Sequence, residues 1–392
     1  MICYSAESVG LSGMGGGVAA VNKIVALLGS GHEVSVLSRK SAALPEVFDG
    51  RPVGRPEWLC PEDILMPLPA WSKEYLAAQV RMICLTRRIQ RLRSNLLVVQ
   101  ASSGHRRAEM YRSWSGVPRI MTMHGSPDQF TGMYDDGVSS LERVLQEMAC
   151  CDGFVLPSER VAAKWKAQGI LQQKSFHIIH NCADEALAAE VVRSGNSAAL
   201  RGGLQIPDDQ FIGVCVASVQ HRKGQDVLLS HLPAILQAVP SFHLYLVGPV
   251  LWGWGGREIV RLIEEHPHRD RVHLVGAVSA RRALEFCGAA DVVILPSREE
   301  CLPITAIEAL LMGVPVVASD VDGLPEVVED GQSGLLFSHE SPEELTAAVV
   351  RMARDKAFRE ACVERGKQVY TEKFTRQLYM QRWERLVREV SS

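Results

Sequence analysis

The sequence predicts an α/β protein made of two successive halves, each a parallel sheet covered by helices on both faces. Short apolar runs that suit buried strands alternate with longer amphipathic patterns that suit helices along most of the chain. Segment 185–210, rich in small residues, separates two such series, and we interpret it as the interdomain connection, with room for a helix inside it. The length of 392 residues is enough for two domains with substantial cores.

The first half begins with a glycine-rich loop, 13–17, which leads into an expected helix at 18–28 and then a strand at 32–38. Further strands are expected at 96–100, 119–123, 153–156 and 175–179, and helices at 72–93, 139–149 and 158–169. The strands of this half are short and apolar, which is typical of a parallel sheet with both faces buried.

The second half repeats this alternation and ends in an amphipathic helix. Its strands are expected at 211–217, 242–247, 271–275, 292–295 and 314–318. The last helix, at 375–390, carries Leu378, Trp383, Leu386 and Val387 on one face. This apolar face predicts that the helix packs onto one of the two domains.

Composition excludes several classes of protein. The net charge of −3, with 22% charged residues, gives no overall case for nucleic-acid binding. The ten cysteines form no Cys-x-x-Cys pair and show no metal-ligand spacing, so a reducing cytoplasm is the expected compartment. The first residues lack a signal-type pattern, and no run of about 18 apolar residues could span a membrane.

The most informative segment is 296–318, in which two carboxylates, Glu300 and Glu308, stand eight positions apart. The expected strand 292–295 precedes it and strand 314–318 ends it, so Glu300 lies in a loop at the carboxyl end of a strand. Ligands of open α/β sheets bind at that edge. The helix that should begin near Pro303 to Thr305 directs its free N–H groups to the same place, which favours an anion such as phosphate.

A second chemical marker follows strand 211–217. Arg222 and Lys223 stand in a strand-to-helix loop, and Gly224 permits a tight turn there. Two cations at the carboxyl end of a strand suit a diphosphate, because arginine offers a planar fork and lysine a compact charge. Taken alone, the loop is better explained as a solvated basic turn; the Glu300 loop on the same predicted sheet favours the binding site.

Together these residues make the chain resemble the retaining nucleotide-sugar glycosyltransferases with two Rossmann-like domains (the GT-B fold), in particular their group 4 family. The matching pattern is Pro-Ser-x-x-Glu-x7-Glu-Ala-x-x-x-Gly-x-Pro-Val-Val-Ala at 296–318, and further matches are Arg222-Lys223-Gly224, Leu246-Val247-Gly248, His273-Leu274-Val275-Gly276, Gly331-x-x-Gly334-Leu335-Leu336-Phe337, Gly15-Gly16-Gly17, Met123-His124-Gly125 and 178–184. The resemblance covers nearly the whole chain. It implies two domains facing each other across a cleft: 1–190 plus 376–392 on the acceptor side, and 199–375 on the donor side.

The resemblance also implies roles for individual residues. Arg222, Lys223 and the helix N-terminus at Ile304 and Thr305 would bind the donor diphosphate, and Glu308 would accept the two ribose hydroxyls. Glu300 would orient the donor sugar, with His124 near that sugar as the second catalytic position. Gly16 and Gly17 would bring the backbone of the first domain close to the diphosphate or the acceptor. Ser218 and Val278 would belong to loops that contact the nucleotide base or the phosphates.

In this family the departing phosphate is thought to help deprotonate the acceptor, so no nucleophile is named and no metal or cofactor is expected. Two departures from the family pattern put the identity of the donor in question. The family often has Glu-Gly-Phe-Gly where this chain has Glu300-Cys301-Leu302-Pro303, and often has an arginine where this chain has Ser218. Arg222 is then expected to carry more of the phosphate charge.

Other functions remain as alternatives. One is a carbohydrate- or nucleotide-binding module without catalysis on the same fold, and another is a related epimerase or phosphorylase. A nicotinamide-dependent enzyme is disfavoured, because Gly13-x-Gly15 is followed by Val18 and Gly-x-Gly-x-x-Gly fails. The pair His266 and His268 suggests a metal site, although such a pair in a charged loop is more often solvated.

One further segment concerns location. Between Lys73 and Arg119 the chain has ten lysines or arginines and two acidic residues, and five of the arginines share the expected helix at 72–93. A basic amphipathic helix can lie on an anionic membrane, which would suit a lipid-linked acceptor. A helix that packs on the sheet with a solvated basic face is the slightly favoured interpretation. The expected partners are therefore a nucleotide-sugar donor and a hydroxyl acceptor, with peripheral membrane contact as an option.

Overall fold

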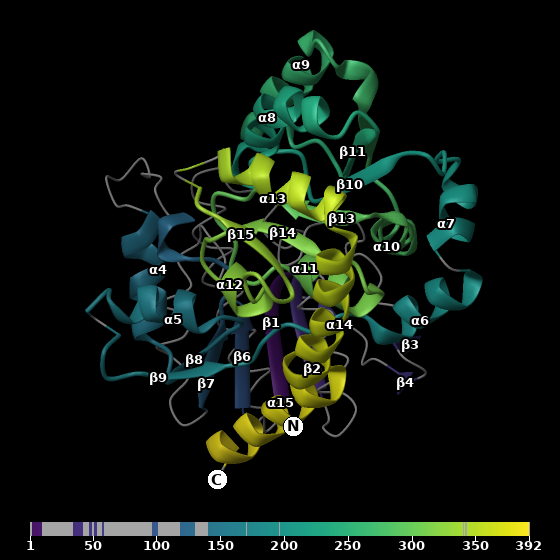
Figure 1. Cartoon of the computed structure of the whole chain (residues 1–392). Coiled ribbons are helices and arrows are strands. Elements are labelled where there is room, and N and C mark those ends of the chain that lie inside the picture. Colours follow the sequence, from purple (N-terminus) through teal and green to yellow (C-terminus); the bar gives the residue numbers. More distant parts are fainter. Residues whose placement is uncertain are drawn as a thin grey trace. The chain divides into compact units, whose positions relative to one another are not determined.

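The computed structural model describes the backbone of the early strands and nearly all of the chain after residue 117. The described residues are 2–9, 34–41, 47–48, 51–52, 57–58, 96–100, 118–129, 140–169, 171–195, 197–339, 341 and 343–391. The chain divides into two compact units (Figure 1). Unit 1 combines Met1–Ile179 with Met380–Ser392, and unit 2 is His180–Tyr379.

Unit 1 contains a seven-stranded sheet in the order β5-β2-β1-β6-β7-β8-β9, in which every strand pair is parallel. Its strands are β1 (Ile2–Val9), β2 (Val34–Ser41), β5 (Glu57–Trp58), β6 (Leu96–Gln100), β7 (Arg119–Thr122), β8 (Gly153–Leu156) and β9 (Ser175–Ile178). A separate antiparallel pair joins β3 (Val47–Phe48) to β4 (Arg51–Pro52). The described helices are η2 (Pro127–Gln129), α4 (Ser140–Ala149) and α5 (Glu159–Lys166).

Unit 2 contains a six-stranded, fully parallel sheet in the order β12-β11-β10-β13-β14-β15. Its strands are β10 (Phe211–Val216), β11 (Phe242–Val247), β12 (Val272–Gly276), β13 (Val292–Leu295), β14 (Val316–Ser319) and β15 (Gly334–Phe337). Its helices are α6 (Glu185–Ser194), α7 (Ser197–Leu204), η3 (His221–Lys223), α8 (Gln225–Ala238), η4 (Trp252–Gly256), α9 (Arg257–Glu265), η5 (Arg269–Arg271), α10 (Ala280–Ala289), α11 (Ile304–Met312), α12 (Leu324–Val327), α13 (Glu343–Arg354) and α14 (Lys356–Lys373).

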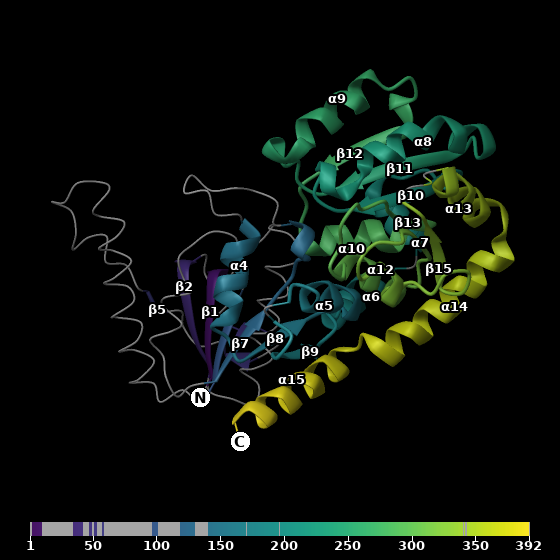
Figure 2. The same cartoon turned by 90° about the vertical axis from the view of Figure 1, so that its left-hand side faces the viewer.

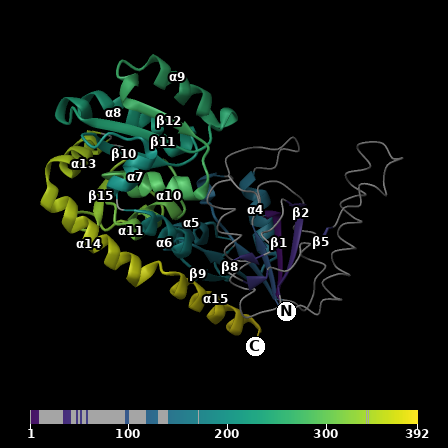
Figure 3. The same ribbon diagram turned by 90° about the vertical axis from the view of Figure 1, so that its right-hand side faces the viewer.

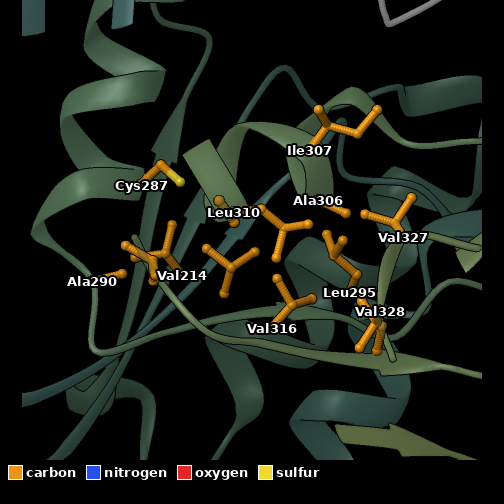
Figure 4. Packing of buried hydrophobic residues seen from close by; sticks show 14 of the residues in the cluster. Val214, Cys287, Ala290, Leu295, Ala306, Ile307, Leu310, Val316, Val327 and Val328 are labelled. Atoms are coloured by element: carbon orange, nitrogen blue, oxygen red, sulfur yellow. The ribbon is translucent and has the colours of Figure 1, made fainter. Parts of the chain in front are cut away.

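The core of unit 2 lies on both faces of its sheet, because successive residues of a strand point to opposite faces. Val316 belongs to a buried cluster with residues of α10, α11 and α14, whereas its neighbour Val317 belongs to a cluster with residues of α8, α9 and α13. Figure 4 shows part of the first cluster, in which Leu310 and Ala306 of α11 lie near Val316. In Figures 2 and 3, α8 and α9 lie above strands β10 to β12 and α10 lies below them. Burying one such aliphatic side chain stabilises the fold by about 1.5–3 kcal/mol.

Most of the expected strands of the described part are present to within two or three residues at each end. Strand β1, the two-residue strands β3, β4 and β5, and strand β15 were not expected from the sequence, although β15 belongs to the segment matched at 331–337. The expected helices at 18–28 and 72–93 lie outside the described residues. Among the described residues, none of the helices combines the length and the hydropathy that a membrane span requires.

The interpretation of segment 185–210 as the connection between domains was wrong. The division between units falls at Ile179 and His180, and the segment holds two helices, α6 and α7, that belong to unit 2. Arg201 is the reason: its guanidinium donates to the carbonyl oxygens of Ala289 and Gln210 and, at 2.7 Å, to the carboxylate of Asp291. These long-range contacts fix α7 to the sheet of unit 2, and the boundaries 1–190 and 199–375 shift accordingly.

The last helix, α15 (Arg376–Ser391), begins in unit 2 and continues into unit 1 from Met380 onward. Its N-terminus is held in unit 2, where the Glu185 carboxylate accepts from the Arg376 N–H at 2.9 Å and from the Tyr370 hydroxyl at 2.7 Å. Trp383 and Leu386 are each 2% exposed within the later part of the helix. Of the apolar face seen in the sequence, Trp383, Leu386 and Val387 are buried and Leu378 is partly buried.

Candidate active site

The loop after β10 is folded tightly enough to direct two cations to the carboxyl end of the sheet. Gly224 has a φ of +69°, and a Cβ there would collide with the carbonyl oxygen of Pro296 after β13. A side chain at this position is therefore excluded by both backbone conformation and space. The Arg298 N–H also donates to the Arg222 carbonyl oxygen at 2.9 Å, which joins the two loops.

A partly buried ion pair stabilises the junction between these two loops. Arg298 binds Asp226, at the start of α8, through two bonds of 2.8 and 2.6 Å, and donates to the His221 carbonyl oxygen. Such a bidentate pair fixes orientation as well as charge. Burial alone would raise the pKa of the half-buried Asp226 carboxyl, but the hydrogen bonds and charge of Arg298 act against it, and the pKa lies below its ordinary value. Arg222 and Lys223 are thus carried by a rigid loop.

The two cations meet Glu300, the first carboxylate of the 296–318 motif. Lys223 Nζ lies 2.8 Å from Oε1 and 2.5 Å from Oε2 of Glu300, and Arg222 Nη1 lies 3.4 Å from Oε2. Glu300 is only 8% exposed. A carboxylate so far from water needs a cationic partner, and removal of Lys223 would leave it with the longer Arg222 contact alone. These distances bring Arg222, Lys223 and Glu300 together at one edge of the sheet, and their roles in binding the donor stay a prediction.

Helix α11 begins at Ile304, as the sequence predicted, and no side chain caps its N-terminus. The first N–H groups of any helix lack an intrahelical acceptor, here no capping side chain supplies one, and the helix dipole is positive at this end. The Thr305 hydroxyl donates to the carbonyl oxygen of Val216, the last residue of β10, at 3.0 Å. This bond ties the N-terminus of α11 to the strand that leads into the Arg222 loop.

Glu308 lies on α11, one turn after Ile304, so that the two residues share a face of the helix. Its side chain is partly exposed. Ser218 follows β10, and its hydroxyl accepts from Gln220 Nε2 at 2.7 Å. Val278 follows β12, two strands away from β10, and packs against the apolar cluster on the α10 side of the sheet.

His124 lies in unit 1, just beyond the carboxyl end of β7. Its Nε2 atom is inaccessible to water and has no hydrogen-bond partner among the described residues, and the same holds for the hydroxyl oxygen of Ser126. Burial lowers the pKa of the His124 imidazole to about 4, so the ring is neutral at pH 7. Two unpaired buried polar atoms at a strand's carboxyl end are unusual and suit a site that binds a polar group.

This pKa leads to a testable effect on stability. Between about pH 6.5 and 4 the unfolded chain binds a proton at His124 that the folded chain does not, so stability falls as the pH falls through this window. We expect wild-type protein to lose about 2 kcal/mol more than His124→Asn between pH 7 and pH 5. Urea unfolding of both proteins at the two pH values measures this difference. Parallel losses in the two proteins would contradict it.

Gly16 and Gly17 lie outside the described residues, as does most of the basic segment 73–119. The His266 and His268 pair is used otherwise: His266 Nε2 lies 3.1 Å from the Leu229 carbonyl oxygen, and its Nδ1 accepts from the His268 N–H. No group of three or more histidine, cysteine or acidic side chains suited to a metal occurs among the residues that the structure describes.

Sequence reasoning did not single out Arg298, Asp226 or Asp322. All three follow the carboxyl ends of strands in the same sheet, and that position could have drawn attention to them. Cys301, beside Glu300, is buried, and burial together with the charges of Asp322 and Glu300 raises the pKa of its thiol far above the ordinary value. It therefore remains a neutral thiol and is a poor nucleophile.

Two family models cover most of the chain. The model described as "Glycosyltransferase Family 4" matches residues 14–187, and the one described as "Glycosyl transferases group 1" matches residues 196–369. Among curated proteins, the D-inositol 3-phosphate glycosyltransferase of a Nocardioides species is 31% identical over 187 residues, 43% of this chain and 40% of that protein. The enzyme of the same name from Streptomyces griseus is 33% identical over 175 residues, 42% of this chain and 37% of that protein. The matched segments thus span about two fifths of these relatives.

Solved structures resemble the chain over its full length. Sucrose-phosphate synthase from Thermosynechococcus elongatus matches with a TM-score of 0.78 at 20% identity, covering 100% of this chain and 99% of that one. Anabaena HepE in complex with UDP and glucose matches with a TM-score of 0.75 at 18% identity, covering 99% of each chain. At this identity the likeness shows the fold alone, and that fold is GT-B. Family models on both units and the shared fold together establish that this chain belongs to the group 4 family of GT-B glycosyltransferases.

Proposed function

We propose that this protein transfers a sugar from a nucleotide-sugar donor, linked to UDP or GDP, to a hydroxyl acceptor with retention of the anomeric configuration. The observation that carries the proposal is the ion cluster of Lys223, Arg222 and buried Glu300 at the edge of the unit 2 sheet. The relatives' printed names support sugar transfer, and the UDP-glucose bound to HepE supports a donor of this class. Biosynthesis of a polysaccharide, glycolipid or other glycoconjugate is the setting in which such a transfer fits.

The chemistry requires stabilisation of a leaving nucleoside diphosphate. Its β-phosphate gains negative charge as the bond to the sugar breaks, and preorganised positive groups lower that barrier. Lys223, Arg222 and the uncapped N-terminus of α11 supply such groups within one loop junction. We infer that they neutralise the phosphate without a metal ion.

The two glutamates then divide the donor between them. Glu300, held by its cations, orients the hydroxyls of the sugar ring against the diphosphate, and Glu308 on α11 accepts the two ribose hydroxyls. His124 and Ser126 supply unpaired polar atoms in unit 1, where the acceptor or the sugar would bind. The departing phosphate itself accepts the acceptor's proton on the same face of the sugar, so no side chain is assigned as base.

A non-catalytic binding module on the same fold is the main alternative, and an epimerase is another. The experiment that separates these functions incubates the protein with a panel of UDP- and GDP-sugars, in buffer with EDTA, and measures release of the nucleoside diphosphate. We expect one donor of the panel to be cleaved, at the same rate with or without the chelator. Binding without cleavage of any donor would favour the module, and interconversion of the sugar without nucleotide release would favour the epimerase. Activity lost in EDTA and restored by Mg²⁺ or Mn²⁺ would contradict metal independence.

A further inference from the structure

Asp322 stands out because its backbone adopts a left-handed conformation, which residues other than glycine rarely adopt. It follows β14 in the turn before α12, has a φ of +46°, and is 5% exposed. Among the described residues, the other non-glycine position with a positive φ is Gln205, an exposed residue after α7. Left-handed backbone is unfavourable for residues with a Cβ, and aspartate and asparagine tolerate it better than most.

The strained turn holds both backbone polar groups of Glu300. The Glu300 N–H donates to Asp322 Oδ2 at 2.9 Å, and the Glu300 carbonyl oxygen accepts from the Gly323 N–H at 3.1 Å. The side chain of Glu300 is held separately by Lys223 and Arg222. Residue 300 is thus fixed at its N–H, its carbonyl and its carboxylate.

The side chain of residue 322 indicates that the bond to the Glu300 N–H is the important contact of this turn. If the turn needed only a left-handed residue, glycine would adopt this φ without strain. Aspartate adds a carboxylate that accepts a charge-assisted bond from one particular N–H, that of Glu300. The bond also stabilises a buried backbone donor that would otherwise lack this acceptor.

We propose that Asp322 is a positioning residue that fixes the backbone of Glu300, so that the Glu300 carboxylate is held against Lys223 and Arg222 in the geometry that sugar transfer requires. This inference rests on the proposed function of Glu300. Orientation of a catalytic group contributes strongly to rate, and a displacement of about 1 Å can reduce turnover by about 100-fold. Asp322 itself need not touch the donor.

Two substitutions at this position separate an effect on the position of Glu300 from an effect on the stability of the fold. Asp322→Gly keeps the left-handed backbone and removes the acceptor, whereas Asp322→Asn keeps a side-chain oxygen that can accept from the Glu300 N–H. Gln205→Gly is the matched control, because it relieves the same kind of backbone strain far from Glu300 in the sequence. Each variant is assayed as the full chain for thermal midpoint, nucleoside diphosphate affinity and donor turnover.

We expect Asp322→Gly to lower kcat by about tenfold or more, with the affinity for nucleoside diphosphate changed by less than about threefold. Asp322→Asn should retain kcat within about threefold, and Gln205→Gly should match wild type. Wild-type kcat in Asp322→Gly would overturn the inference. So would an equal loss in Gln205→Gly, or a loss in Asp322→Asn as large as that in Asp322→Gly.

Amide hydrogen exchange at Glu300 tests the contact independently of any reaction. We expect its N–H to exchange at least about tenfold faster in Asp322→Gly than in wild type, since a lost hydrogen bond exposes the donor. Unchanged exchange would overturn the inference even if donor turnover is observed. If wild-type protein cleaves no donor, the proposed function fails, and the exchange result alone decides whether Asp322 fixes Glu300.

Discussion

Lys223→Ala is expected to reduce kcat/KM for the donor by about 100-fold, equivalent to about 3 kcal/mol. The substitution removes one charge-assisted contact to the leaving phosphate, which alone contributes about 1.5–3 kcal/mol. It also leaves the 8%-exposed Glu300 carboxylate with Arg222 Nη1, at 3.4 Å, as its remaining cation from this pair. Steady-state kinetics with the best donor of the panel measure the effect.

The matched control is Lys356→Ala, which removes an exposed lysine from a surface pair with Glu360 on α14. Such pairs contribute little, so this variant should have wild-type kinetics. Because Lys223→Ala leaves the buried Glu300 carboxylate with the 3.4 Å Arg222 contact alone, adding Glu300→Gln should recover stability without recovering activity. If folded Lys223→Ala has the kcat/KM of wild type, Lys223 does not stabilise the leaving phosphate.

Glu300→Gln is expected to lower kcat, whereas Glu308→Gln is expected to raise KM. Glutamine at 300 keeps the shape of the side chain and loses the charge that holds Lys223 and binds the sugar hydroxyls. We expect kcat to fall by about 100-fold with little change in KM, because the lost contact acts in the transition state. Glutamine at 308 should mainly raise KM, by about tenfold, because its proposed partner is the ribose of the bound donor.

The pair of glutamates serves as its own control, since both substitutions remove one carboxylate from the same loop and helix. Kinetics of Glu300→Gln equal to those of wild type would refute its assignment to catalysis. A fall in kcat for Glu308→Gln with unchanged KM would refute the ribose assignment. Nucleotide affinity measured without donor turnover separates the two effects further.

The architecture of unit 2 could be predicted because each of its strands has a recognisable pattern in its own short stretch of sequence. Runs such as Val292–Leu295 are apolar at every position, which is what a parallel strand buried on both faces requires. The meeting of Arg222, Lys223 and Glu300 could also be predicted, because residues after neighbouring parallel strands share one edge. Strands β10 and β13 are paired neighbours in the sheet.

Other features depend on contacts between residues far apart in sequence. The composition of α7 suggested a linker, and its place in unit 2 depends on Arg201 reaching Asp291, 90 residues later. The sequence Asp322-Gly323 suggests a turn, but not that its carboxylate binds the N–H of a residue 22 positions earlier. The unpaired Nε2 of His124 likewise follows from burial, which no local pattern encodes.

The central claim is that Lys223 and Arg222 bind the terminal phosphate of a nucleoside diphosphate. Calorimetric titration of wild-type, Lys223→Ala and Arg222→Ala protein with the nucleoside diphosphate and the matching monophosphate tests it most directly. We predict that each substitution weakens diphosphate binding by about 1.5–3 kcal/mol and monophosphate binding by clearly less. Equal losses for the two nucleotides, or no loss for either, would contradict the claim.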